Sequence, residues 1–218
     1  MGENNSSVRV VKPVFDELIN THKIGKFLQL VLPKDFSAGE VIEICYEGNP
    51  SEKVLAPRDE FLNWCRENPD KLKNPVEARK RLADDKLYKF EGHTHPDIYI
   101  ETQQCYVGIE AKWTEPDITT HTTWRDVGER DQLIRHMDAL IGAPYEKPVF
   151  GLFIIDANGK ISADSVLSRF STDEYIMASV PHRINDNSWK ELKKGFCGVW
   201  AWQKIRDQLE LTEPTCIV

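Results

Sequence analysis

Two short peptides hold the residues whose types and spacing are best suited to chemistry. The first ends in Pro96-Asp97 and the second is Glu110-Ala111-Lys112, with twelve residues between Asp97 and Glu110. Carboxylate and carbonyl oxygens are the ligands that hard divalent cations such as Mg²⁺ prefer. An amine beside them can orient a water or neutralise charge that develops during a reaction. The two peptides therefore predict a metal-assisted hydrolytic site of the kind that cleaves a phosphodiester.

The segments that carry these peptides have the pattern of a β-hairpin. Residues 97–101 and 105–112 alternate and are rich in β-branched and aromatic side chains, and Thr102-Gln103-Gln104 between them suits a turn. A turn at 103–104 sets residue 97 opposite residue 110, since opposed positions then sum to about 207. The hairpin is therefore expected to bring the two carboxylates together.

Alternation along the second strand adds a further constraint. Glu110 and Lys112 face the same way as Gly108, which leaves room for a ligand or a backbone, whereas the Ala111 side chain faces the other way. Asp97, Glu110 and the backbone carbonyl of Ala111 are the predicted ligands of Mg²⁺, with Mn²⁺ expected to substitute, and Lys112 is the predicted catalytic amine. The motif is short, so an exposed acid–base pair on a surface hairpin is the competing interpretation.

The elements around this hairpin predict an α/β fold. Between residues 75 and 156 the order is a helix, two or three antiparallel strands, a polar helix, and an apolar strand of the kind that is covered on both faces. The periodicity predicts strands at 27–32, 41–46, 87–91, 97–101, 105–112 and 149–155, and helices at 13–20, 57–67, 75–86, 128–141, 162–170 and 203–211. Trp189, Trp200 and Trp202 are expected as core or lid aromatics.

Composition limits the class of protein. A chain of 218 residues with 40% hydrophobic and 29% charged residues fits one domain, expected over 11–218 after a disordered stretch at 1–10. No apolar run is long enough to span a membrane, and five scattered cysteines form no Cys-x-x-Cys pair, so a reducing, cytoplasmic setting is expected. The net charge of −7 argues against a non-specific nucleic-acid coat protein but permits a local basic patch.

One such patch precedes the hairpin. Basic residues outnumber acidic ones between positions 71 and 89, and Arg79, Lys80 and Arg81 are the predicted nucleic-acid contacts within it. A solvated helix face would have the same charge pattern. His93 and His95 alternate just before Asp97, but two histidines without a third nitrogen or thiolate ligand make a poor zinc site. Glu101 shares the face of Asp97 and is expected either to extend the acidic cluster or to line the sheet edge.

Pro96-Asp97 and Glu110-Ala111-Lys112, in this order of elements, resemble the PD-(D/E)xK, or restriction-endonuclease-like, nuclease superfamily over about residues 75–156. The resemblance implies a central mixed sheet flanked by helices with a helix–strands–helix–strand core. It also implies Mg²⁺-dependent phosphodiester cleavage with Asp97 and Glu110 as metal ligands and Lys112 as a catalytic residue.

The resemblance suggests further residues on the two flanking helices. Many members carry a Gln or Arg on the helix after the catalytic strand, where this chain has Gln132 as a catalytic candidate and Arg130 as a nucleic-acid contact. The exonuclease branch usually has Tyr four residues after that Gln, where this chain has His136. Glu77 is the candidate for the upstream helical Glu of some members, and His121 and Trp124 lie in the loop after Lys112.

The function expected from these residues is metal-dependent hydrolysis of nucleic acid, with DNA favoured as substrate and endonuclease favoured over exonuclease. A symmetric dimer would suit double-strand cutting. The alternative is a non-catalytic module that keeps the nuclease-like fold and acts through a protein partner. The acidic net charge favours this alternative, whereas the intact Asp97, Glu110 and Lys112 argue against it.

Overall fold

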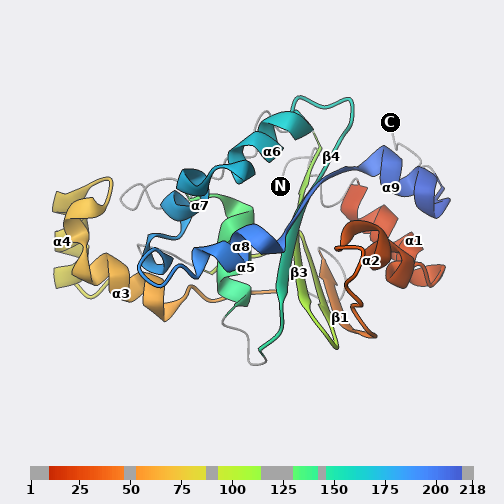
Figure 1. Cartoon of the computed structure of the whole chain (residues 1–218). Coiled ribbons are helices and arrows are strands. Elements are labelled where there is room, and N and C mark those ends of the chain that lie inside the picture. Colours follow the sequence, from red (N-terminus) through yellow and green to blue (C-terminus); the bar gives the residue numbers. More distant parts are fainter. Residues whose placement is uncertain (1–9, 47–52, 87–92, 114–129, 142–145, 213–218) are drawn as a thin grey trace.

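The computed structural model describes residues 10–46, 53–86, 93–113, 130–141 and 146–212 (Figure 1). Within them, a five-stranded mixed sheet with the order β1-β2-β3-β4-β5 runs through the molecule with helices on both faces. The strands are β1 (Val41–Tyr46), β2 (Ile98–Thr102), β3 (Tyr106–Lys112), β4 (Val149–Ile155) and β5 (Phe196–Ala201). The expected α/β class with a mixed sheet is confirmed.

The strand pairings divide the sheet into two halves. β1, β2 and β3 pair antiparallel, and β4 and β5 then add in parallel to β3. In the β2–β3 hairpin Ile98 lies opposite Ile109 and Tyr99 opposite Gly108, so opposed positions sum to 207 as expected. The expected order of antiparallel strands, a helix and a further strand is therefore observed from β2 to β4.

Helices cover both faces of the sheet. α1 (Lys12–Asn20), α2 (Ile24–Val31) and α9 (Trp202–Leu209) lie on one face, where Ile100, Val107 and Leu152 point (Figure 1). The other face carries α5 (Gln132–Leu140), α6 (Ala163–Ser171), α7 (Asp173–Ser179) and α8 (Trp189–Gly195). α3 (Asp59–Glu67) and α4 (Pro75–Ala83) form a small outlying unit with the 3₁₀ turn η2 (Pro69–Lys71), and η4 (Pro181–Arg183) packs against α3.

Two glycines let α5 lie close to the sheet. Gly108 of β3 and Gly151 of β4 are direct neighbours in the parallel register. A Cβ built on Gly151 would lie 2.3 Å from Sδ of Met137, and one on Gly108 would lie 3.3 Å from Cδ1 of Leu140 and 3.8 Å from Cβ of His136. The room expected at Gly108 is therefore taken by the side chains of α5.

The structure differs from the expectations at one predicted strand and in three elements that were not predicted, α7, α8 and β5. Residues 27–32 were expected as a strand, but residues 27–31 belong to α2, whose buried residues Ile24, Phe27, Leu28 and Val31 have helical spacing. The short apolar run hid this period, because a strand and a buried helix segment look alike over six residues. β5 was not expected, since Gly198 with its positive φ of 89° and a shift in register interrupt its pattern.

Some expectations lie partly or wholly outside the described residues. These are the stretch at 1–9, the strand at 87–91 and the start of the helix expected from residue 128. Val10, the last residue of the stretch expected to be disordered, is buried in the core. No helix among the described residues is long and apolar enough to cross a bilayer.

Substitution of Gly151 tests the close approach of α5. In Gly151→Ala the new methyl group meets Met137 and forces the helix or that side chain to shift, so we expect a loss of about 1–3 kcal/mol in the free energy of unfolding. Gly25→Ala is the matched control: nothing lies within 4 Å of a Cβ at this α2 position, so the change should be neutral or stabilise by up to about 1 kcal/mol. Urea denaturation measures both, and equal stabilities would contradict the packing.

Candidate functional site

Glu110 is the centre of a hydrogen-bonded cluster on the α5 face of the sheet. Its side chain is 1% exposed, and its two oxygens have different partners. Nζ of Lys112 lies 2.6 Å from Oε1, and Nε2 of His136 lies 3.0 Å from Oε2. Strand alternation explains why Lys112 can reach Glu110, as the sequence predicted, whereas His136 arrives from α5.

Asp97 lies at the entrance of β2, where continuing the hairpin register sets it opposite Glu110. Its Oδ2 accepts a hydrogen bond of 2.7 Å from the backbone N–H of Ala111, which ties the carboxylate to the edge of β3. Burial, and then the negative charge of Glu110, raise the pKa of Asp97 well above its ordinary value, and the Lys112 charge opposes this shift. The structure thus brings the two predicted carboxylates into electrostatic contact.

The side chain and the backbone groups of Ala111 point in different directions. Its side chain is buried in the core between the sheet and the α1–α2–α9 layer, on the face opposite to Glu110. Its backbone N–H is directed to Asp97, and in a strand the carbonyl of a residue lies on the same edge as its N–H. The Ala111 carbonyl is therefore on the Asp97 side of β3, as a shared ligand role would require.

His136 links Glu110 to a further residue. Oγ1 of Thr94 lies 2.9 Å from Nδ1 of His136, and both residues are buried. Burial, and then the charge of Arg135, lower the pKa of His136 to about 3, so the ring is neutral at pH 7. A neutral ring between these partners donates from Nε2 to the Glu110 carboxylate and accepts the Thr94 hydroxyl at Nδ1.

Sequence reasoning did not predict the roles of His136 and Thr94. His136 was noticed only as a departure from the exonuclease pattern. Its position, four residues after Gln132 and hence on the same side of a helix, was the one signal that it belonged to the site. Thr94 carried no signal, because its contact depends on how the segment before β2 packs against α5.

The start of α5 positions Gln132 beside the amine. Nζ of Lys112 donates to Oε1 of Gln132 at 3.4 Å, so this residue joins the site as predicted, through a long hydrogen bond. Asp131 caps the helix by accepting from the backbone N–H of Ile134 at 3.0 Å and from the Tyr175 hydroxyl at 2.8 Å. These bonds cap the first turn of α5 and hold it against α7.

Arg130 does not reach a surface where nucleic acid could bind, and its prediction as a contact is corrected. The side chain is 2% exposed, lies 3.9 Å from the ring of Phe61, and donates to Asp138 at 3.0 Å and to the Ser179 carbonyl at 2.6 Å. An arginine beside a polar helix start looks the same in sequence whether it faces solvent or the core. Its burial is decided by the packing of α3 and α7.

The basic residues of α4 lie far from the carboxylates. Figure 1 shows α4 at the edge of the molecule, well away from β3. Lys80 is exposed, Arg79 is paired with Asp70, and Arg81 with Glu77 at 3.2 Å. Glu77 is thus engaged within its own helix and does not join the site.

The other candidates take separate positions. Glu101 is bound by Lys147 at 2.8 Å and by the Tyr99 hydroxyl at 3.0 Å, so it lines the sheet away from Glu110. His93 and His95 are exposed. Among the described residues, no group of three or more His, Cys, Asp or Glu side chains has a metal-binding arrangement. His121 and Trp124 lie outside the described residues.

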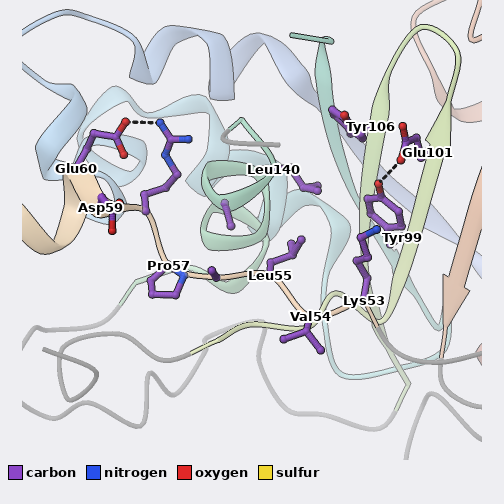
Figure 2. A pocket seen from close by; sticks show the side chains of 13 residues that line it. Lys53, Val54, Leu55, Pro57, Asp59, Glu60, Tyr99, Glu101, Tyr106 and Leu140 are labelled. Atoms are coloured by element: carbon purple, nitrogen blue, oxygen red, sulfur yellow. Dashed lines mark hydrogen bonds and ion pairs between the residues drawn. The ribbon is translucent and has the colours of Figure 1, made fainter. Parts of the chain in front are cut away.

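A cavity of about 570 Å³ opens on the same sheet face, beyond Tyr99 and Leu140 (Figure 2). The Arg58–Glu60 ion pair lies across the cavity from the Tyr99–Glu101 hydrogen bond. Its tyrosine rings are almost completely buried, and Nζ of Lys53 lies 4.5 Å from the centre of the Tyr99 ring. The cavity wall is joined to the site, because Leu55 exchanges two backbone hydrogen bonds with Thr94, the partner of His136.

The neutral state of His136 predicts a pH-dependent stability. An unfolded histidine takes up a proton as the pH falls below about 6.5, whereas the folded ring resists protonation until about pH 3. The unfolded state therefore binds more protons, and we expect His136 to cost about 2 kcal/mol of stability between pH 7 and pH 5. Urea denaturation at both pH values should show a smaller loss for His136→Gln than for the wild type. Equal losses would mean that the ring is protonated in the folded protein.

Comparison with protein-family models, with curated proteins and with solved structures finds no match in any of the three. The case for a function therefore rests on the residues and on their geometry.

Proposed function

We propose that this protein hydrolyses phosphodiester bonds of nucleic acid in a metal-dependent reaction at Asp97, Glu110 and Lys112, as in the PD-(D/E)xK nucleases that the sequence resembles. The observation that carries the proposal is the meeting of these residues at one edge of β3. Asp97 is bonded to the backbone of Ala111, and Glu110 to the ammonium of Lys112. As part of the same proposal, the sheet and the helices around it form a restriction-endonuclease-like core.

The donor set fits a hard divalent cation. Two carboxylates and a peptide carbonyl offer oxygen ligands, and solvent and a substrate phosphate would complete the shell of Mg²⁺ or Mn²⁺. The repulsion between Asp97 and Glu110, which contributes to the raised pKa of Asp97, is the electrostatic situation that a cation relieves. When bound, such a cation would lower the pKa of a water and offset charge on the phosphate.

The protein side chains supply orientation and charge. Glu110 receives hydrogen bonds from Lys112 and His136, which hold its carboxylate in one rotamer, as the supporting residues of a metal ligand commonly do. Lys112 keeps a positive charge beside the position of the phosphate and orients the attacking water. In the hydrolysis the water oxygen bonds to phosphorus, the P–O bond to the leaving group breaks, and that oxygen gains a proton.

One observation favours the alternative of a non-catalytic binding module. Glu110 is 1% exposed and both of its oxygens already have partners, as in a buried ion pair that serves structure. The nuclease proposal also includes DNA as the substrate, endonucleolytic cutting and a homodimer. These parts hold only if the protein cleaves nucleic acid.

A cleavage assay on supercoiled DNA and on single-stranded RNA with Mg²⁺ or Mn²⁺ tests the proposal. Asp97→Asn and Lys112→Met should each lower the rate by at least about 100-fold, because the first removes a ligand charge and the second the ammonium. Glu101→Gln is the matched control, since Glu101 shares the sheet face of Asp97 but pairs with Lys147. Its rate should stay within about threefold of the wild type.

Metal binding gives an independent measurement. Calorimetric titration with Mn²⁺ should show binding to the wild type and to Glu101→Gln, and a loss of binding in Asp97→Asn. Cleavage that survives both Asp97→Asn and Lys112→Met would place the activity elsewhere. A folded wild-type protein that neither binds Mn²⁺ nor cuts either nucleic acid would support the binding module instead.

A further inference from the structure

A second cavity lies between α8, the start of β4 and the end of α5, and has a volume of about 390 Å³. Its walls combine apolar and cationic groups. Ile141 and Val149 supply apolar surface, and Arg183, Ser188 and Lys194 supply hydrogen-bond donors. Val149 precedes Phe153, the partner of Glu110 in β4, by four residues, which is about 13 Å along a strand. The cavity is therefore distinct from the carboxylate site.

Arg183 is the buried cation of this cavity. The residue is 8% exposed; its Nε donates to Asp138 at 2.6 Å and its Nη1 to the Ser188 hydroxyl at 3.3 Å. Within the described part of the chain its Nη2 is buried without a hydrogen-bond partner. Arg183 lines the cavity, and a buried donor that is left unsatisfied, as its Nη2 is, costs about 1–3 kcal/mol.

Arg183 shares its carboxylate partner with a second arginine. Asp138 accepts hydrogen bonds from both arginines. Arg183 donates to its Oδ1, and Arg130 donates to its Oδ2 at 3.0 Å. Nε2 of His182 also lies 3.2 Å from Oδ1. Although burial opposes it, the hydrogen bond from His182 and the charges of Arg130 and Arg183 hold the pKa of Asp138 below its ordinary value. One buried carboxylate thus accepts hydrogen bonds from two arginines.

The mouth of the cavity adds a surface pair. Lys194 and Glu191 both line it, 3.6 Å apart, and both side chains are largely exposed. Lys147 also reaches the cavity, but its ammonium is engaged by Glu101 and by the Thr102 carbonyl. Lys194 is therefore the exposed cation at the mouth that can pair with an anionic ligand, and Glu191 is the exposed carboxylate that would repel it.

We propose that this cavity binds a small organic anion, whose phosphate or carboxylate group is held by Arg183, Ser188 and Lys194 and whose apolar body lies on Ile141 and Val149. A guanidinium presents several donors to such oxyanions, and a hydroxyl beside it adds one more. The site is independent of the proposed nuclease chemistry. α5 connects the two, because it carries both Asp138 and His136.

Binding is tested on the whole ¹⁵N-labelled chain by NMR titration with phenyl phosphate, benzoate, inorganic phosphate and uncharged benzyl alcohol. We expect saturable shifts of the Ser188 and Gly195 amide signals with phenyl phosphate or benzoate, weaker shifts with inorganic phosphate, and none with benzyl alcohol. The tighter of the two aromatic anions identifies the class of the charged group. If neither aromatic anion shifts these amides, the proposal is overturned.

Surface variants show whether the response comes from this cavity. Lys194→Gln should weaken binding by about two- to fivefold and Glu191→Gln should strengthen it by a similar factor, because each changes one exposed charge at the mouth. Lys190→Gln, which removes a lysine of the same helix outside the lining, should leave the affinity unchanged.

Arg183→Lys should weaken binding more than tenfold, since an ammonium cannot reproduce the guanidinium contacts. If this variant does not fold, the exposed pair decides the question. Equal affinities for Lys194→Gln, Glu191→Gln and Lys190→Gln would overturn the proposal, and so would an unchanged affinity in folded Arg183→Lys.

Discussion

The candidate site depends on the close approach of α5 to the sheet. Gly108 and Gly151 lie side by side on β3 and β4. The Met137 side chain occupies the space that a Cβ on Gly151 would take, and Leu140 and His136 lie 3.3 and 3.8 Å from the place of a Cβ on Gly108. Only at this short distance can the His136 ring bond to Glu110, which is two residues beyond Gly108. The same helix carries Gln132 to Lys112, so one packing constraint sets the surroundings of both residues.

Charged groups buried around α5 make this arrangement specific. Glu110 is enclosed by Lys112 and His136, and Asp138 by Arg130, Arg183 and His182. A buried charge that loses its partner costs several kcal/mol. A displaced α5 would separate Asp138 from its cationic partners and would remove the hydrogen bond of His136 from Glu110. The two clusters differ in balance. Carboxylates dominate at Asp97 and Glu110, where a cation would fit, and guanidinium groups dominate at Arg183, where an anion would.

The hairpin and the strands around it could be predicted because their signals are local. The pairing of residue 97 with residue 110 follows from the turn position alone, and the apolar period of 149–155 marks β4 to the residue. The predictions failed where the local signal was ambiguous or absent. Five apolar residues within 27–32 fit a strand or a helix, and Gly198 weakened the strand pattern of β5.

The sequence by itself determined which residue types meet at the edge of β3, since the hairpin register and strand alternation place Asp97, Glu110 and Lys112 without reference to the rest of the chain. Only the tertiary structure decided what surrounds them. The contact of His136 with Glu110, the support from Thr94 and the burial of Arg130 join segments far apart in sequence. Such contacts arise from the packing of helices on the sheet, and short-range patterns of apolar residues in the sequence do not predict them.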